Sequence, residues 1–210
     1  MGTGVFITLE GIEGCGKSTQ AGLVERFLTD SGVGVVLTRE PGGSAIGEKV
    51  RQILLDPGNL DMFPMTELLL YEASRSQHVE EVIRPALDSG KAVVCDRFYD
   101  ASTAYQGFAR GIGWEKVDRL NLVATGGRKP DLTIVLDLPV MSGLKRLGKN
   151  LDRIEGETVE FHEKVRKGYI KIAEREPERV KVVDASGSIE QTFAKVRKLV
   201  ESLLAERKVR

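Results

Sequence analysis

The hydrophobic pattern of the chain consists of short, nearly continuous apolar runs that alternate with longer amphipathic stretches. The runs rich in Val, Ile and Leu predict β-strands at residues 5–10, 33–38, 92–96, 132–137 and 179–183. Continuous apolar character is typical of strands that are covered by helices on both faces. The amphipathic stretches predict helices at 18–31, 44–55, 64–89, 114–125, 140–149, 158–176 and 188–207. This alternation predicts an α/β protein, a three-layer α/β/α sandwich around a five-stranded parallel sheet.

The length of the chain agrees with one folded unit. The 210 residues contain no internal repeat, low-complexity tract or interdomain linker, so residues 1–210 are expected to form a single domain. Lys and Arg together number 31, as do Asp and Glu, and the formal net charge is zero. No global positive field would attract nucleic acid or an anionic membrane, so neither is expected as a partner, and any anion site must be local.

Cysteine usage and apolar content predict a cytoplasmic protein. Cys15 and Cys95 are far apart in the sequence and form no disulfide framework, so both are expected to be free thiols in a reducing compartment. No window approaches the roughly 20 apolar residues that would span a bilayer. The N-terminal residues lack the basic flank and long apolar stretch of a signal peptide.

A glycine-rich phosphate-binding motif follows the first predicted strand. Residues 11–18 read G-I-E-G-C-G-K-S, which satisfies G-x-x-x-x-G-K-[ST] between a strand and a helix. Such a loop directs backbone N–H groups at phosphate oxygens, and the helix that follows adds its positive N-terminal end. Lys17 is expected to reach the β- and γ-phosphates and Ser18 to bind Mg²⁺, which indicates a fold of the P-loop NTPase type. The ATP-binding residues predicted here are Gly11, Ile12, Glu13, Gly14, Cys15, Gly16, Lys17, Ser18 and Thr19.

The phosphate-binding loop does not by itself identify the acceptor of the phosphate. The N-K-x-D segment that specifies guanine is missing from the later part of the sequence, which argues against a GTPase. An ATPase remains possible on the loop alone. Asp96 and Arg97, however, end the third predicted strand, at the edge of a parallel sheet where ligands bind. There Arg97 can hold a phosphate through a bidentate contact, and Asp96 can hold Mg²⁺ through water.

Further motifs occur in a fixed order along the chain. They are T-R-E-P-G-G at 38–43, L-L-Y-E-A-S-R at 69–75, D-R-F-Y-D-A-S-T-A-Y-Q-G at 96–107 and D-R-I-E at 152–155. Together with the phosphate-binding loop, they resemble the thymidylate kinase family, from about residue 5 to residue 176. The resemblance implies transfer of the γ-phosphate of ATP to dTMP with Mg²⁺, in dTTP biosynthesis, by a homodimer that is formed through helix packing.

The resemblance also implies a binding site for dTMP. Tyr71 and Arg75 project from one face of a predicted helix, so a ring that stacks on the base would lie beside a donor for thymine O4. The family usually has Phe at the position of Tyr71 and often Asp at the position of Glu13. In the family, an Arg in the place of Arg51 binds the 5′-phosphate, and Tyr105 would pack under the deoxyribose. The dTMP-binding residues expected are Glu13, Glu40, Arg51, Tyr71, Arg75, Arg97, Ser102, Tyr105 and Gln106.

A basic segment at about 144–156 resembles the lid of the family. Members of the family place a catalytic basic residue either in the phosphate-binding loop or in the lid, and residues 12–15 include none. Arg153 is therefore the expected catalytic lid residue, with Arg146 and Lys149 as additional phosphate contacts. The catalytic set predicted from the sequence is Lys17, Arg97 and Arg153, and the metal-binding set is Ser18 and Asp96.

Two alternatives remain beside a thymidylate kinase. The first is a kinase for another nucleoside monophosphate or for a free nucleoside, which would share the phosphate-binding loop but have a different acceptor pocket. The second is a regulatory module that binds ATP and signals to a partner. The strand-end Arg97, the face formed by Tyr71 and Arg75 and the lid argue against the second, because a switch has no use for a second nucleotide pocket.

Overall fold

The structure is a computed structural model that describes residues 4–207. Its five strands form one parallel sheet in the order β2-β3-β1-β4-β5. The strands are β1 (Phe6–Glu10), β2 (Val35–Arg39), β3 (Ala92–Asp96), β4 (Leu132–Asp137) and β5 (Val180–Asp184). The inner strands are buried nearly throughout, whereas the edge strands β2 and β5 are half-exposed. This agrees with the continuous apolar runs of the sequence.

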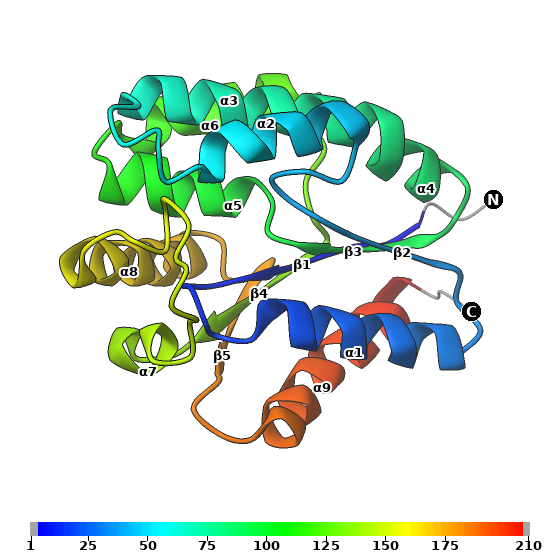
Figure 1. The fold of residues 1–210 in the computed structure, drawn as a ribbon. Coiled ribbons are helices and arrows are strands. Elements are labelled where there is room, and N and C mark those ends of the chain that lie inside the picture. Colours follow the sequence, from blue (N-terminus) through cyan, green and yellow to red (C-terminus); the bar gives the residue numbers. More distant parts are fainter. Residues whose placement is uncertain (1–3, 208–210) are drawn as a thin grey trace.

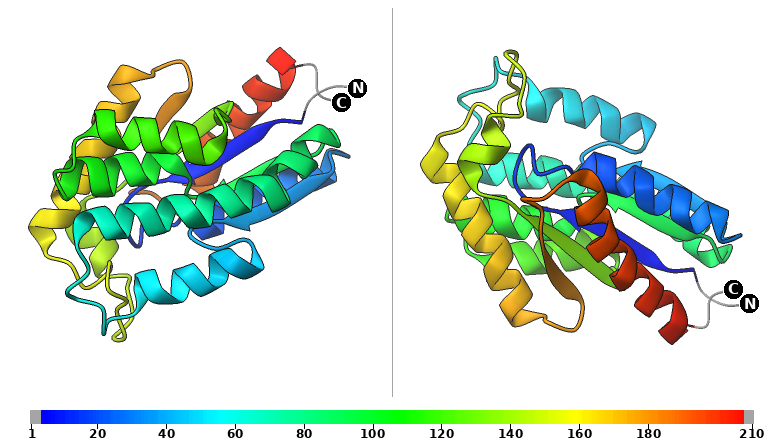
Figure 2. Two further views of the ribbon diagram at one scale, coloured as in Figure 1. Left: turned by 90° about the horizontal axis from the view of Figure 1, so that it is seen from above. Right: turned by 90° about the horizontal axis from the view of Figure 1, so that it is seen from below.

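Helices connect the strands and form two outer layers (Figure 1). They are α1 (Lys17–Asp30), α2 (Ala45–Leu55), α3 (Pro64–His78), α4 (Arg84–Asp88), α5 (Tyr99–Ser102), α6 (Trp114–Thr125), α7 (Val140–Leu144), α8 (Val159–Arg175) and α9 (Ile189–Arg207). Two π-helical segments, η1 (Val79–Ile83) and η2 (Thr103–Ala109), continue α3 and α5. Helices α1 and α9 lie side by side below the sheet, and α2, α3 and α6 lie above it (Figures 1 and 2). The predicted three-layer sandwich with a five-stranded parallel sheet is confirmed.

The sheet brings three functional segments to one edge. In the register of the sheet, Asp96 of β3 lies opposite Leu9 of β1 and opposite Arg39 of β2. The backbone N–H of Glu40 donates to the carbonyl oxygen of Asp96 at 3.0 Å. Because all strands are parallel, the loops that follow β1, β2 and β3 meet at this carboxyl edge.

Two predicted helices differ from the observed ones. The predicted helix 64–89 is continuous but contains the π-helical turn η1, which lies next to Pro85. Proline lacks the N–H of a regular helical turn, and the wider turn accommodates this loss. The predicted helix 140–149 is wrong beyond Leu144, where α7 ends. The residues that follow are mostly exposed and include Gly148, so no buried face sustains the helix.

Both cysteines, Cys15 and Cys95, are buried free thiols, as predicted. Over residues 4–207, no helix is long and apolar enough to cross a membrane.

Candidate active site

The phosphate-binding loop joins β1 to α1 and needs glycine at several positions. Gly11, Gly14 and Gly16 all have positive φ angles, of 135°, 68° and 98°. At Gly14 a Cβ atom would also lie 2.1 Å from the carbonyl oxygen of Gly143, so the loop packs directly on α7. The ammonium group of Lys17 donates to the carbonyl oxygen of Ile12 at 2.8 Å and is held inside the loop.

A single cavity of about 720 Å³ opens beside this loop. Its walls include Gly14 to Thr19 of the predicted ATP-binding set, and Glu13. Gly11 and Ile12 of that set contribute no wall: the Ile12 side chain is buried in the core, and the carbonyl oxygen of Gly11 accepts a hydrogen bond from Arg97. The same cavity is also lined by residues that were expected to bind the acceptor.

Eight of the nine residues expected to bind dTMP line the cavity, Glu13 and Arg97 among them, and the other six form its acceptor wall. They come from the end of β2, from α2 and α3, and from α5 and η2, and they are Glu40, Arg51, Tyr71, Ser102, Tyr105 and Gln106. Arg51 donates to the carbonyl oxygen of Pro41 at 2.9 Å, and this bond holds its guanidinium against the loop between β2 and α2. The fold therefore gathers side chains as far apart in the sequence as Glu40 and Gln106, 66 positions, onto one wall.

Arg97 lies between the two halves of the cavity. It is the one non-glycine residue with a positive φ angle, 71°, in the described part of the chain. Its guanidinium donates to the carbonyl oxygen of Gly11 at 2.9 Å and to the carboxylate of Glu13 at 2.6 Å. It also lies over the ring of Tyr105, 5.1 Å from the ring centroid. Arg97 is thus held against the phosphate-binding loop while it faces the acceptor side.

Glu13 is ionised because of its cationic neighbours. Burial by itself would raise the pKa of this carboxyl, but the charges of Arg97 and Lys17 and a hydrogen bond from the Tyr105 hydroxyl lower it to about 2. The carboxylate therefore compensates the positive charge of Arg97 at the cavity wall.

Ser18 and Asp96 meet at the floor of the cavity. The Ser18 hydroxyl donates to a carboxylate oxygen of Asp96, and both residues line the cavity. A hydroxyl and a carboxylate are the hard oxygen donors that suit Mg²⁺, which usually takes few protein ligands and completes its shell with water and phosphate oxygens. Among residues 4–207, no group of three or more His, Cys, Asp and Glu side chains is placed to hold a metal ion by itself.

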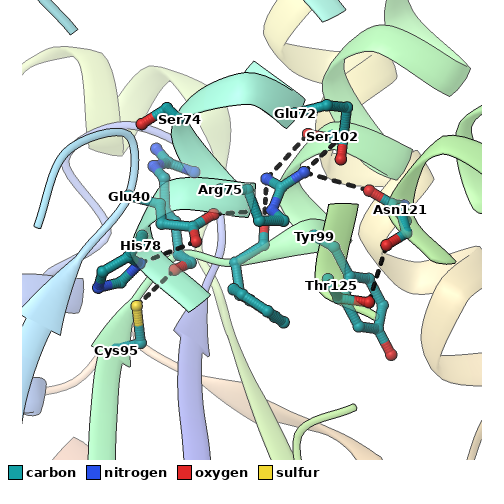
Figure 3. Close-up of polar contacts among 12 residues, drawn as sticks. Glu40, Glu72, Ser74, Arg75, His78, Cys95, Tyr99, Ser102, Asn121 and Thr125 are labelled. Atoms are coloured by element: carbon teal, nitrogen blue, oxygen red, sulfur yellow. Dashed lines mark hydrogen bonds and ion pairs between the residues drawn. The ribbon is translucent and has the colours of Figure 1, made fainter. Parts of the chain in front are cut away.

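Arg75 does not line the cavity, contrary to the expectation that it faces the base. Its side chain is 1% exposed and lies beneath the cavity wall, where it is held by several acceptors (Figure 3). It donates to Glu40 at 2.8 Å, to Glu72 at 2.5 Å and to the Ser102 hydroxyl at 3.0 Å. Burial works against the charged guanidinium, but these carboxylates outweigh it and raise the pKa of Arg75. In this arrangement Arg75 orients two wall residues, Glu40 and Ser102.

Arg153 also lies away from the cavity wall. The segment between α7 and α8 runs past the C-terminal end of α2 (Figure 1). There the backbone N–H of Arg153 donates to the carbonyl oxygen of Leu55, and its Nε donates to the carbonyl oxygen of Leu54. Its guanidinium further donates to the buried carboxylate of Glu67 at 2.6 Å. The cavity wall instead includes Arg146, which donates to the carbonyl oxygen of Gly14 at 3.2 Å. Lys149 is exposed and is not part of the wall.

Some wall residues were not expected from the sequence. The turn between β5 and α9 and the first turn of α9 line the cavity beside the phosphate-binding loop, with Ala185, Gly187 and Ser188 from the turn and Ile189 and Thr192 from the helix. The Gln20 amide of α1 donates to the carbonyl oxygen of Ile189 at 3.1 Å and ties this turn to the loop. The signal in the sequence was the position of this turn after a strand, at the same carboxyl edge as the other site segments.

Comparison with known proteins places this site in a family. A family model described as "Thymidylate kinase" matches residues 9–196. A protein of Desulfosudis oleivorans named thymidylate kinase is 55% identical over 192 residues, covering 87% of this chain and 90% of its own length. Another of that name, from Geotalea uraniireducens, is 50% identical over 211 residues, covering 97% and 99%. The crystal structure of thymidylate kinase from Ehrlichia chaffeensis superposes with a TM-score of 0.79 at 35% identity, covering 95% of this chain and 99% of that one.

Proposed function

This chain belongs to the thymidylate kinase family, and we propose that it transfers the γ-phosphate of ATP to dTMP, giving ADP and dTDP for dTTP biosynthesis. The observation that carries this proposal is the single cavity shared by the phosphate-binding loop and the acceptor wall, with Arg97 between them. Phosphoryl transfer needs two nucleotides held in line and the negative charge of the transferring group neutralised. A cavity with this division supports both requirements.

We assign the charge-neutralising roles to cationic residues of the cavity wall. Lys17 is proposed to hold the β- and γ-phosphates of ATP, and Arg97 the acceptor phosphate and the transferring group. Arg153 was the catalytic lid residue expected from the sequence, but its buried contacts with Glu67 and Leu54 favour Arg146 for direct contact with phosphate. Ser18 and Asp96 would hold Mg²⁺, which when bound supplies positive charge at the phosphate oxygens.

The acceptor wall suits a pyrimidine deoxynucleotide. We propose that the ring of Tyr71 stacks on thymine and that Arg51 binds the 5′-phosphate. Tyr105 would lie under the deoxyribose, where a 2′-hydroxyl would otherwise be placed, and this contact would disfavour ribonucleotides. Glu13, Glu40, Ser102 and Gln106 complete the proposed pocket, and Arg75 is proposed to act on it from beneath through Glu40 and Ser102.

The remaining features extend the proposal. The turn between β5 and α9 lines the cavity beside the phosphate-binding loop, so we propose that it contacts the adenine of ATP. Residues 1–210 are proposed to act as one kinase domain with a lid at about 144–156. We further propose a cytoplasmic homodimer that uses exposed apolar side chains of α3 and α6, including Leu69, Leu122 and Val123.

The test is ADP release by the purified protein from ATP and Mg²⁺, with dTMP, dUMP, dCMP, AMP, thymidine or no acceptor in parallel reactions. Release that depends on dTMP, with a kcat/KM at least tenfold above that for the other acceptors, is expected, because the base pocket and the phosphate-binding loop act on one complex. A rate that ignores every acceptor would indicate an ATPase or a regulatory module. A preference for another acceptor would contradict the assignment of the base pocket.

A further inference from the structure

The backbone of Arg97 is held in a conformation that most residues avoid. A φ angle of 71° is unfavourable at a non-glycine residue, so neighbouring contacts must maintain it. The N–H of Arg97 donates to the carbonyl oxygen of Leu9 at 3.0 Å. The next N–H, that of Phe98, donates to Oε1 of Glu10 at 2.7 Å. The last residue of β1 therefore fixes the peptide that follows Arg97.

The second carboxyl oxygen of Glu10 is directed to the side chain of the same arginine through a tyrosine. The hydroxyl of Tyr169, on α8, lies 2.7 Å from Oε2 of Glu10. Nη1 of Arg97 donates to that hydroxyl oxygen at 3.2 Å. Glu10 and Tyr169 are 0% and 1% exposed, and neither is part of the cavity wall. A buried pair of residues thus contacts the peptide N–H that follows Arg97 and the guanidinium of Arg97.

The close approach of α8 that delivers Tyr169 depends on the preceding glycine. A Cβ atom at Gly168 would lie 3.1 Å from Cα of Ala104 and 3.1 Å from Cβ of Phe108, both in η2. Because Gly168 has no side chain, α8 can pack directly on η2 and bring the Tyr169 hydroxyl to the end of β1. This hydroxyl then accepts a hydrogen bond from Nη1 of Arg97.

We propose that Tyr169 and Glu10 are positioning residues for Arg97, which hold its guanidinium in the orientation required for phosphoryl transfer. The contact between them serves in either protonation state of Glu10, because a phenol donates to a carboxylate and accepts from a carboxylic acid. Nη1 is held by Tyr169 and by the carbonyl oxygen of Gly11, and Nη2 remains on the side of Glu13 and the cavity. This inference rests on the proposed function, in which Arg97 contacts the transferring group.

The test compares Tyr169→Phe with Tyr99→Phe. Tyr169→Phe removes only the hydroxyl that contacts Glu10 and Arg97, and kcat is expected to fall about tenfold, because a small displacement of a catalytic group is costly, while KM for ATP changes less than twofold. Tyr99 is a matched control: its hydroxyl is buried without a hydrogen-bond partner in the described residues, so Tyr99→Phe is expected to keep kcat within twofold. Thermal melting of each variant measures any loss of the folded state.

A third variant, Glu10→Gln, tests whether hydrogen bonds or charge matter. It retains an acceptor for the Phe98 N–H and offers a donor to Tyr169, so kcat is expected to stay within about threefold of the wild type. A loss as large as that of Tyr169→Phe would overturn the proposal. So would a Tyr169→Phe enzyme with kcat within twofold of the wild type, or a fall in kcat that Tyr99→Phe shares or that a lower folded fraction accounts for.

The wild-type rate and the ratios between variants answer different questions. The dependence of the wild-type rate on dTMP tests the proposed function, whereas the ratio of variant to wild-type kcat tests the positioning of Arg97. Were the wild type to prefer another monophosphate, the proposed acceptor would be wrong, and the ratios would be measured with that monophosphate.

Discussion

Two glutamates that flank the start of the phosphate-binding loop have opposite pKa shifts. Burial raises the pKa of Glu10 to about 8, and the negative charge of Asp100 adds to this effect, although Arg97 and two hydrogen bonds oppose it. At Glu13 burial acts in the same direction, but Arg97 and Lys17 outweigh it and lower the pKa to about 2. Residue type is identical at the two positions, so the difference arises from which cations each carboxyl faces.

The raised pKa of Glu10 predicts a stability that falls as pH rises. In the unfolded chain this carboxyl titrates near 4.5, so between about pH 4.5 and 8 the folded state binds a proton that the unfolded state lacks. Its contribution is therefore complete below pH 4.5 and is lost as pH rises through about 8. Glu10→Gln does not titrate, and its melting temperature is expected to fall less between pH 5 and pH 8. Thermal melts at intervals of half a pH unit measure this difference.

The titration of Glu13 does not contribute to the change in melting temperature between pH 5 and pH 8. Its lowered pKa places its titration between about pH 4.5 and 2, where stability is lost as pH falls. Equal slopes for wild type and Glu10→Gln between pH 5 and 8 would contradict the raised pKa of Glu10.

At the scale of elements, a buried carboxylate is hydrogen-bonded both to the segment 144–156, which we proposed to be a lid, and to the acceptor side. Glu67 of α3 accepts hydrogen bonds from Arg153 of the lid, at 2.6 Å, and from Arg110 and Gln106 of the η2 region. Burial would raise the pKa of Glu67, but these donors lower it, so the carboxylate is charged. Arg153 of the proposed lid and the wall residue Gln106 are therefore held by the same carboxylate, that of Glu67.

Because Arg153 binds Glu67 and Arg146 does not, we expect different effects from substitution of these two arginines. Arg153→Ala removes a donor from a buried carboxylate, so it is expected to cost about 1–3 kcal/mol of unfolding free energy and to lower turnover as well. Arg146→Ala removes an exposed side chain at the cavity wall, and it is expected to lower kcat by an order of magnitude or more without lowering the melting temperature. Steady-state kinetics and thermal melts of both variants measure the separation.

Lys149→Ala is the control for these lid variants, because Lys149 is exposed and not part of the wall. Normal stability with strongly reduced kcat in Arg153→Ala would return the catalytic role to Arg153. Normal kcat in Arg146→Ala would remove Arg146 from it.

At the scale of the whole molecule, α3 and α6 lie side by side above the sheet and expose large apolar side chains. Leu69 of α3 is 49% exposed, and Leu122 and Val123 of α6 are 60% and 79% exposed. Apolar side chains gathered on adjacent helices are typical of a surface that another protein covers. We proposed above that a second copy of the chain covers it.

A dimer predicts a mass in solution of twice 23.1 kDa. Val123→Asp would place a charge on this surface and is expected to shift the protein toward the monomer, because a carboxylate that is buried and unpaired in the dimer is costly. Val159→Asp on α8 is the control, since Val159 is 45% exposed at the first turn of a different helix. Light scattering at micromolar concentration distinguishes the two, and a wild-type monomer would remove the proposed dimer.

The sequence by itself determined the fold and the phosphate-binding loop. Continuous apolar runs indicated parallel strands, and G-x-x-x-x-G-K-[ST] placed Lys17 and Ser18, because both signals depend on residues that are close together in the chain. Strand ends also located Arg97 correctly at the carboxyl edge. Local patterns of this kind survive into the structure because the backbone geometry of a strand or a tight turn is set within a few residues.

The tertiary structure alone decided which long side chains reach the cavity. Helical spacing put Tyr71 and Arg75 on one face, yet only Tyr71 lines the cavity, because Glu40 and Ser102 bind Arg75 beneath it. Arg153 likewise points away from the cavity because it donates a hydrogen bond to buried Glu67. The hydrogen bond between Arg97 and Tyr169 joins residues that lie 72 positions apart. A charged side chain turns toward whichever partners the fold brings within hydrogen-bonding distance, and those partners come from distant segments whose approach no local pattern encodes.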